Sequence, residues 1–358
     1  MKHINRLLPL DSLRGLAALG VAFFWHYQHF ISIESAPFRK VGYWFYHFGW
    51  NLVDLFFVLS GFIFMHVYSQ RIKEKRISFK EYGILRLSRL YPLHIVTLVI
   101  VSIIQFIRSL ELNNFFIYQY NDVYHFVLNI FFLQHGWFDY GFSFNAPTWS
   151  ISVEIVAYIL LFIVLFKFPT SYNYLLVTII LIGLSITKMK LSLPLLNDGM
   201  GRVFIGFFVG CCTFEVNKLL NSQRLKKLAA CISLFLLVVL FIIGFFIGHY
   251  ALGNWPIVYT VVVFPLIVIM VLNLKFLTRI LSLKPITYLG DISYSIYLWH
   301  FPVQLLIKTT DDILKLSLDY SSRVVYLSIV IITLVVSSLS HEFFEKPVLK
   351  FLRKTKKT

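Results

Sequence analysis

Long apolar stretches, each close to the length that crosses a bilayer, follow one another along most of the chain. A transmembrane helix needs about 20 consecutive, mostly apolar residues. Ten stretches approach or exceed that length: 13–33, 49–69, 90–109, 149–167, 172–187, 202–218, 228–248, 256–274, 289–308 and 324–344. The pattern therefore predicts an all-α integral membrane protein with about ten transmembrane helices. An eleventh stretch, 122–135, is short and carries polar residues, so we expect it to be interfacial or re-entrant.

The distribution of Lys and Arg predicts which stretches cross. Cytoplasmic loops of membrane proteins are enriched in basic residues. Seven Lys or Arg lie within 71–89, four within 218–227 and six within 346–357. All three segments can be cytoplasmic only if an even number of crossings separates them, and 122–135 is the weakest candidate for a span. With ten spans and both termini cytoplasmic, 24 basic residues lie on the cytoplasmic side and nine on the external side. No other even or odd arrangement of the spans places as many basic residues on the cytoplasmic side.

Composition supports this class of protein. Hydrophobic residues make up 58% of the chain and charged residues 14%, which is unusual for a soluble globular domain. The net charge of +16 is explained by basic cytoplasmic loops, so we expect no nucleic-acid partner. The three cysteines lie in apolar runs and indicate neither a disulfide framework nor a metal site. We interpret 1–347 as a single membrane domain and 348–358 as a basic cytoplasmic tail.

Ionisable and polar residues within the predicted spans are the main candidates for function, because placing them in lipid is costly. The first span contains Arg14, His26 and His29, and the second contains Asp54. Further candidates stand at the ends of later spans or within them: Arg86, Arg89, Tyr91, Asn145, Trp149, Ser150, Glu154 and His300.

Several of these residues belong to five motifs that follow one another along the chain. They are Leu-Asp-Ser-Leu-Arg-Gly (10–15), Val-Asp-Leu-Phe-Phe-Val-Leu-Ser-Gly-Phe (53–62), Arg-x-x-Arg-x-Tyr-Pro (86–92), Trp-Ser-x-Ser-Val-Glu (149–154) and Ser-Tyr-x-x-Tyr-Leu-Trp-His (293–300). In this combination and order, from about residue 10 to 347, the chain resembles the acyltransferase-3 family. These multispanning membrane acyltransferases include O-acetylases of bacterial O-antigens and exopolysaccharides.

The resemblance implies transfer of an acyl group, usually acetyl, from cytoplasmic acyl-CoA to a sugar hydroxyl on the other face of the membrane. The expected location is therefore the cytoplasmic (inner) membrane. The expected partners are acetyl-CoA as acyl donor, a cell-surface or lipid-linked glycan such as lipopolysaccharide O-antigen as acceptor, and membrane lipid. In the family, an arginine and a histidine of the first helix are the essential pair, and they match Arg14 and His26.

The spacing of this pair departs from the family pattern, which usually has ten intervening residues, whereas eleven separate Arg14 from His26. A step of eleven positions along an α-helix returns to within about 20° of the same face, whereas a step of twelve ends about 120° away. We therefore expect either a π-bulge between the two residues or a position for Arg14 in an irregular first turn. His29 is the local alternative to His26.

The chemistry assigns roles to the candidates. Histidine suits a general base near neutral pH, so we expect His26 to deprotonate the hydroxyl, with Asp54 or Glu154 fixing its tautomer. A covalent acyl-histidine remains an alternative. Other expected roles are oxyanion donors for Ser150 and His300, coenzyme A phosphate ligands for Arg14, Arg86 and Arg89 beside Tyr91, and substrate contacts for Asn145 and Trp149.

Each assignment has a structural alternative. Arg86 and Arg89 could be topogenic charges, and Arg14 could snorkel to the interface. Asp54 could form a buried ion pair, and His26 and His300 could serve in packing only. For the whole chain, the alternative function is a multispanning transporter or glycan flippase, although we find no paired, Gly/Pro-broken spans in two halves. The sugar, its hydroxyl and the oligomeric state are not predicted.

Overall fold

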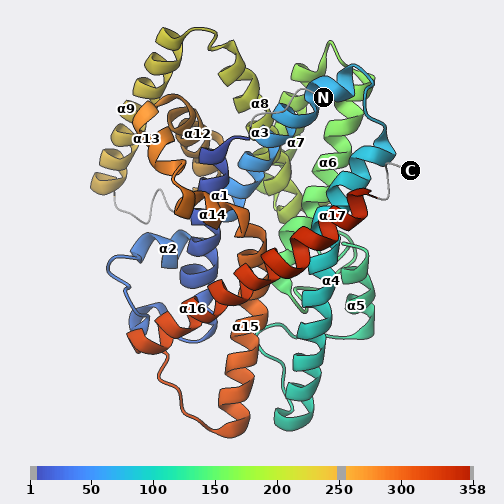
Figure 1. Ribbon diagram of the computed structural model, residues 1–358, viewed down its shortest axis with the longest axis vertical. Coiled ribbons are helices and arrows are strands. Elements are labelled where there is room, and N and C mark those ends of the chain that lie inside the picture. The colour runs from blue at the N-terminus through green and yellow to red at the C-terminus, as the bar shows by residue number, and fades with distance from the viewer. Residues whose placement is uncertain (1–5, 248–254, 355–358) are drawn as a thin grey trace. The chain divides into compact units, whose positions relative to one another are not determined.

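The computed structural model describes residues 6–247 and 255–354 (Figure 1). The chain folds into two compact units. Unit 1 contains residues up to Ala17, Phe48–Ile77 and Glu154–Asp291. Unit 2 contains Ala18–His47, Ser78–Val153 and the residues from Ile292 onward. Each unit is therefore assembled from segments that are far apart in the sequence.

Nearly all described elements are helices. Unit 1 holds most of α1 (Leu8–Gly20) and α6 (Trp149–Lys167), together with α3 (Asn51–Lys73), α7 (Tyr172–Met189), α8 (Asp198–Leu219), α9 (Gln223–Ile247), α11 (Pro256–Val258), η5 (Tyr259–Val263), α12 (Phe264–Asn273), α13 (Lys275–Leu281) and α14 (Lys284–Asp291). A two-stranded antiparallel hairpin, β1 (Ser192–Leu193) and β2 (Leu196–Asn197), pairs Ser192 with Asn197.

Unit 2 begins with the last residues of α1, which are followed by a π-helix, η1 (Val21–Trp25), and a 3₁₀-helix, η2 (His26–His29). Its other elements are η3 (Ile33–Ser35), α2 (Tyr43–Phe48), α4 (Phe79–Leu112), α5 (Val123–Ile130), η4 (Ala146–Thr148), α15 (Ser293–Leu314), α16 (Arg323–Ser340), η6 (His341–Glu345) and α17 (Lys346–Lys354). The part of the predicted tail that is described, up to Lys354, is thus helical.

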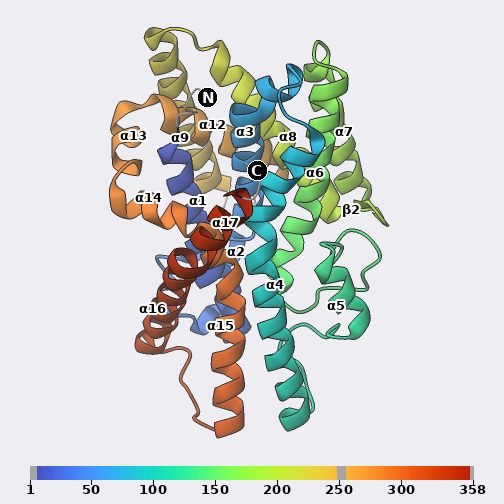
Figure 2. The same cartoon turned by 45° about the vertical axis from the view of Figure 1, so that its right-hand side comes forward.

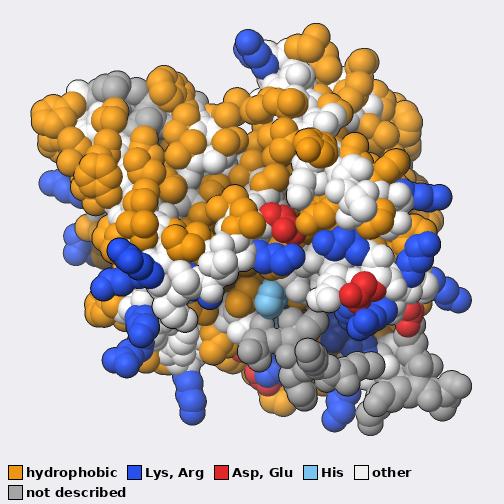
Figure 3. Space-filling view, turned by 90° about the horizontal axis from the view of Figure 1, so that it is seen from above, with side chains coloured by type: hydrophobic (Ala, Val, Ile, Leu, Met, Phe, Trp, Pro, Cys, Tyr) orange, Lys and Arg blue, Asp and Glu red, His pale blue; other side chains and the backbone are white. Residues whose placement is uncertain are grey.

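Nine helical stretches among the described residues are long and apolar enough to cross a membrane. They are Leu8–His29, Asn51–Lys73, Phe79–Leu112, Ala146–Lys167, Tyr172–Met189, Asp198–Leu219, Gln223–Phe246, Pro256–Asn273 and Arg323–Arg353. Large apolar side chains are widely exposed on them, for example Phe235 (65%), Phe241 (70%) and Phe246 (81%). Figure 3 shows one face on which broad hydrophobic areas alternate with Lys and Arg side chains. The exposed apolar side chains of the helices suit contact with lipid.

Two stretches differ from the helices expected from sequence. The predicted ninth span, 289–308, is interrupted at Ile292, so that α14 ends at Asp291 and α15 begins at Ser293. With 22 residues, α15 is long enough to cross a membrane. Its Ser, Tyr, His and Gln residues make it less apolar than the nine stretches named above, so it is not among them. A tenth crossing stays a prediction. The stretch 122–135 contains only the eight-residue helix α5, which is too short to span.

Helix α4 begins well before the expected start of the third span at residue 90. Ser78 and Glu81 form a capping box: Ser78 Oγ accepts a hydrogen bond from the Glu81 amide (3.2 Å), and the Ser78 amide donates to Glu81 Oε2 (3.0 Å). This arrangement satisfies amides at the helix N-terminus. As a result, Arg86 and Arg89 lie on a helix rather than in a basic loop.

Glycines allow the helices of unit 1 to approach closely. A Cβ atom on Gly61 of α3 would lie 1.8 Å from the carbonyl oxygen of Phe207, and one on Gly210 of α8 would lie 2.0 Å from the carbonyl oxygen of Val58. Small residues at helix contacts are typical of membrane proteins, where packing rather than the hydrophobic effect drives association. The pair α3 and α8 forms the centre of unit 1.

The core of unit 2 lies between α4 and α15, which run side by side in both views (Figures 1 and 2). Its buried residues are Leu98, Val101, Ile104, Phe116, Phe144, Phe301 and Leu305. Helix α15 also packs against α16 and against the π-helix η1. These contacts hold the C-terminal end of the first predicted span against the middle of α15.

Candidate active site

The first predicted span changes its helical type between Arg14 and His26. Regular α-helix α1 extends from Leu8 to Gly20 and is followed by η1, whose last hydrogen bond runs from the His26 amide to the Val21 carbonyl five residues earlier. A π-turn takes up one extra residue relative to an α-helix. Arg14 lies well inside α1, so the π-bulge, and not an irregular first turn, accommodates the additional residue.

His26 forms a hydrogen bond with His300 of α15 within unit 2. The Nδ1 atom of His26 lies 2.7 Å from Nε2 of His300. The two ring planes differ by 6° and the centroids are 4.8 Å apart. Because the centroid separation is much larger than the distance between the nitrogens, the rings meet edge to edge in nearly one plane, as an in-plane imidazole hydrogen bond requires.

The hydrogen bonds of His300 assign the tautomer of both rings. Nδ1 of the fully buried His300 lies 3.3 Å from the carbonyl oxygen of Ile296, which can only accept. In neutral His300 the proton therefore sits on Nδ1 and Nε2 accepts from Nδ1 of His26. Nε2 of His26 then carries a free lone pair, and no residue within 6–247 and 255–354 hydrogen bonds to it.

Both ring nitrogens of His29 have partners. Nδ1 lies 3.1 Å from Oε1 of Gln304, and the Tyr118 hydroxyl lies 3.4 Å from Nε2. Gln304 is oriented by a hydrogen bond from its Nε2 to the carbonyl oxygen of Ala22 (3.2 Å). The His29 ring lies 5.0 Å from that of His26. This arrangement favours a packing role for His29 and leaves His26 as the better candidate for a proton acceptor.

Ser150 and Asn145 also contact α15 near His300. The Tyr297 hydroxyl donates to the carbonyl oxygen of Pro147 (2.8 Å). Ser150 Oγ lies 3.0 Å from that hydroxyl and 3.4 Å from the same carbonyl oxygen, and both can accept its proton. Asn145 Nδ2 donates to the carbonyl oxygen of Leu298 (3.0 Å). The proton of Ser150 and the Nε2 atom of His300 are thus engaged in bonds within the protein, and the expected oxyanion role of both residues gains no support from this geometry.

Trp149 begins α6 beside these residues. Its ring lies 5.3 Å from that of His135, and its carbonyl oxygen accepts from Ser152 Oγ (2.8 Å). Unit 2 therefore brings together four of the predicted site residues around α15 or next to it: His26, Asn145, Ser150 and His300. Trp149 is adjacent to Ser150 in the chain.

Arg14, Asp54 and Glu154 belong to unit 1. Asp54, which is 1% exposed, forms an ion pair with Arg202 of α8 (Nε to Oδ1, 3.0 Å), and Arg202 also donates to the carbonyl oxygen of Trp50 (3.2 Å). A buried charge needs such a partner. The structure thus shows the buried ion pair that was the alternative interpretation of Asp54. The hydrogen-bond partner of His26 Nδ1 is His300 and not a carboxylate.

The predicted phosphate ligands of unit 2 lie on α4. Arg86 and Arg89 are half-buried and share one face of the helix because they are three residues apart. Tyr91 does not belong to the face of Arg86 and Arg89. It lines an apolar pocket of about 430 Å³ together with Pro92, Phe131 and Phe132. The pocket lies between α4, the end of α5 and α17.

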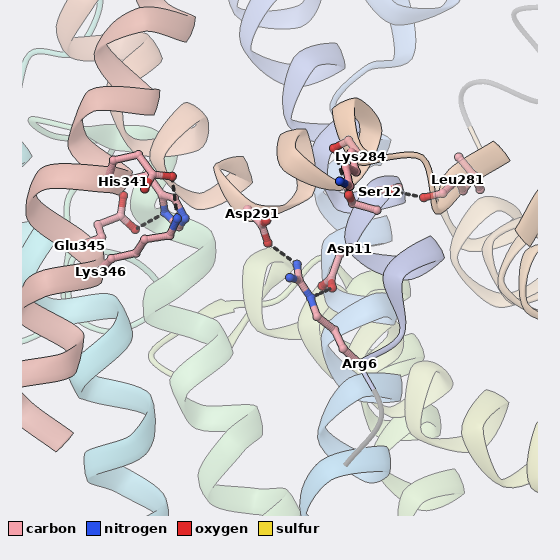
Figure 4. A network of polar contacts seen from close by, with 11 residues as sticks. Arg6, Asp11, Ser12, Leu281, Lys284, Asp291, His341, Glu345 and Lys346 are labelled. Atoms are coloured by element: carbon pink, nitrogen blue, oxygen red, sulfur yellow. Dashed lines mark hydrogen bonds and ion pairs between the residues drawn. The ribbon is translucent and has the colours of Figure 1, made fainter. Parts of the chain in front are cut away.

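The first sequence motif of the chain takes part in a polar network of unit 1. Arg6 bridges Asp11 and Asp291, and Ser12 Oγ donates to the carbonyl oxygen of Leu281, as the close-up shows (Figure 4). Gly15 is required beside this network, since a Cβ there would lie 2.6 Å from the carbonyl carbon of Leu289. Asp11 of this motif is thus linked through Arg6 to Asp291 of α14, and Ser12 is linked to α13.

Gln304, Tyr297 and Arg202 were not predicted as site residues. Gln304 follows His300 by four positions, so both lie on one face of α15, and a polar pair at this spacing in an apolar helix was a usable signal. The Tyr297 hydroxyl and the pairing of Arg202 with Asp54 depend on contacts between distant segments. No group of three or more His, Cys, Asp or Glu that could hold a metal occurs in the described part of the chain.

Comparison with known proteins agrees with the family that the sequence motifs indicate. Residues 8–342 match the profile of the acyltransferase-3 family, described as an acyltransferase domain. The chain is 27% identical to the peptidoglycan O-acetyltransferase OatA of Listeria monocytogenes over 98% of its length and 24% identical to the O-acetyltransferase OatA of Staphylococcus aureus over 96%. It spans 57% and 58% of the length of these relatives. No solved structure shows significant similarity to the chain.

Proposed function

Because the chain belongs to the acyltransferase-3 family, we propose that it is a multi-pass membrane O-acetyltransferase that moves an acetyl group from acetyl-CoA to a hydroxyl of a cell-envelope glycan. The names of the two relatives support O-acetyl transfer. The geometric support is the hydrogen bond between His26 and His300, because it leaves a basic nitrogen of His26 without a partner among the described residues. This family membership also favours an enzyme over the transporter or flippase alternative.

In the proposed reaction, Nε2 of His26 accepts the hydroxyl proton of the sugar as the oxygen attacks the thioester carbonyl. The C–O ester bond forms and the C–S bond breaks. The proton then passes from His26 to the departing thiolate, so that coenzyme A leaves as the free thiol. Throughout, Nδ1–H of His26 stays bonded to Nε2 of His300, which holds the ring in the productive tautomer.

For the acyl donor we propose binding at the cytoplasmic face, with phosphates held by arginines. Arg14, Arg86 and Arg89 offer guanidinium groups suited to phosphate oxygens. His26 follows Arg14 by twelve residues, a step that would cover about 18 Å in a regular α-helix at 1.5 Å per residue. An extended pantetheine arm is needed to cover such a distance, which suits coenzyme A as the carrier of the acetyl group.

For the acceptor we propose peptidoglycan as the first glycan to test, because the Listeria relative is named a peptidoglycan O-acetyltransferase. O-antigen and exopolysaccharide, which the sequence resemblance suggests, are the competing acceptors. Base-labile acetyl esters on each purified glycan, compared with and without the chain in otherwise identical cells, distinguish these possibilities.

The test of the base is the His26→Ala variant. Loss of the proton acceptor lowers acetyl transfer by roughly 10²–10⁴-fold. Membranes that contain equal amounts of wild-type or variant protein are supplied with radiolabelled acetyl-CoA and glycan, and the acetyl esters formed are counted.

His47→Ala is the matched control, since His47 is a half-buried histidine of α2 whose Nδ1 bonds to the Tyr43 carbonyl oxygen (2.9 Å). We expect it to retain most of the activity. If the His26→Ala protein transfers acetyl groups as fast as the wild type, the proposed base is wrong.

A further inference from the structure

The loop between α4 and α6 exposes aromatic rings that the proposed chemistry does not use. Five of them, which we call the aromatic surface, are between 41% and 72% exposed: Tyr120, Tyr124, Phe138, Tyr140 and Phe142. The rings of Tyr124 and Tyr140 lie 5.6 Å apart, and both contact the ring of the buried His125. The tyrosines therefore form a continuous group rather than scattered exposed residues.

Hydrogen bonds beneath the aromatic surface hold it in place. Asp122 accepts from both the amide and Nδ1 of His125, each at 2.8 Å. Nε2 of His125 then accepts from the Tyr140 amide at 3.3 Å, and the Tyr124 hydroxyl donates to the carbonyl oxygen of Phe138 at 2.9 Å. Residues 138–140 are thus fixed to the start of α5.

Gly141 supports a third ring. A Cβ atom at this position would lie 2.5 Å from the Tyr120 ring, so the ring rests directly on the Gly141 backbone. Rings that are ordered before binding lower the entropy lost on association. The loop therefore presents aromatic rings that contacts within the loop hold in place.

Charge within the aromatic surface favours a glycan over a lipid surface. The Asp122 side chain is 55% exposed beside the rings. Burial acts to raise the pKa of Asp122, but the hydrogen bonds from His125 together lower it below its usual value, so the carboxylate is ionised at neutral pH. It can accept hydrogen bonds from sugar hydroxyls, whereas it repels anionic lipid headgroups.

Tyr118 connects the aromatic surface to the candidate base. Its ring lies 6.0 Å from that of Phe142, and its hydroxyl lies 3.4 Å from Nε2 of His29. The His29 ring in turn lies 5.0 Å from that of His26. A chain of ring contacts through Tyr118 and His29 therefore connects the aromatic surface to His26.

We propose that the aromatic surface binds the glycan acceptor, an oligosaccharide whose sugar faces stack on the tyrosine rings and whose hydroxyls hydrogen bond to Asp122. The acceptor specificity of the chain is then determined by this loop. The proposal rests on the proposed function, because the glycan is the acceptor of that reaction. The competing role for exposed tyrosines is anchoring at the membrane interface.

The test measures binding of chitotetraose, a soluble tetramer of β-1,4-linked N-acetylglucosamine, to the full chain in lipid nanodiscs without acetyl-CoA. Tyr140→Ala removes the most exposed ring of the surface, which is 72% exposed. We expect it to raise the Kd for chitotetraose by roughly fivefold, as the loss of one aromatic contact implies. Tyr174→Ala is the matched control, since Tyr174 is 80% exposed on α7 in the other unit, and it should bind like the wild type.

Separate outcomes address the inference and the proposed function. An unchanged Kd in Tyr140→Ala, as membrane anchoring implies, or no binding by the wild type, overturns the inference. If the wild type binds chitotetraose, Tyr140→Ala weakens this binding and the wild type never transfers acetyl groups, the proposed function fails while glycan binding at the aromatic surface stands. If Tyr140→Ala acetylates glycan with an unaltered KM for the glycan, the inference fails and the proposed function stands.

Discussion

At the scale of single residues, we propose that the hydrogen-bonded pair His26 and His300 acts as a histidine and a carboxylate act in a hydrolase triad. His300 fixes the tautomer of His26, and the Ile296 carbonyl fixes the tautomer of His300. The sequence singled out both histidines but assigned His300 to the oxyanion. The contact between His26 Nδ1 and His300 Nε2 depends on the π-turn that ends at Trp25. A motif of residue types alone does not predict this local geometry.

We propose that His300 positions the ring of His26, and variants of His300 distinguish this orienting role from packing alone. His300→Leu removes the acceptor for Nδ1–H of His26, so the ring loses its preferred tautomer. We expect kcat to fall by roughly 10²–10⁴-fold, as when the orienting group of a triad is lost, with the KM for acetyl-CoA nearly unchanged. His300→Gln keeps an acceptor oxygen, so it should recover at least part of that loss in kcat.

Steady-state kinetics on purified protein in nanodiscs provide both constants. Equal kcat values for the Leu and Gln variants would indicate that His300 only fills space. A large rise in the KM for acetyl-CoA, with kcat retained, would indicate that His300 contributes to binding of the acyl donor instead.

At the scale of elements, the sequence predicted the positions of most helices but not how closely they pack. Apolar length alone identified α3, α8, α9 and α16, because a lipid environment requires such stretches. It placed the start of α4 at residue 90, since the basic residues before it looked like a loop. The Ser78–Glu81 capping box, visible in the sequence as Ser-x-x-Glu, shows why the helix begins earlier.

Gly210 tests the close packing of α3 and α8. In Gly210→Ala, the new methyl group would meet the Val58 carbonyl oxygen 2.0 Å away, and the helices must separate. We expect the variant to be less stable by about 1–3 kcal/mol, seen as a lower midpoint in thermal unfolding of the detergent-solubilised protein.

Gly83→Ala is the control for the same substitution. Gly83 lies within α4, and nothing is within 4 Å of a Cβ there, so Ala should leave stability unchanged or raise it by about 0.5–1 kcal/mol. Equal midpoints for the two variants would contradict the steric explanation.

At the scale of the whole molecule, composition and basic segments led to an all-α membrane protein, and the described helices agree with that class. The family followed from five motifs and is confirmed by the match over residues 8–342. The division into two units was not predicted, because each unit joins segments separated by between 30 and 138 residues. The cytoplasmic position of both termini remains a prediction from charge.

The most direct test of the central claim is acetyl transfer across a sealed bilayer. Purified protein is reconstituted in vesicles with acetyl-CoA on one side and a soluble peptidoglycan fragment on the other, and acetyl esters on the glycan are measured by mass spectrometry. With His26 as the base, the wild type should form esters across the bilayer and His26→Ala should form essentially none. Equal ester formation by both proteins would contradict the account.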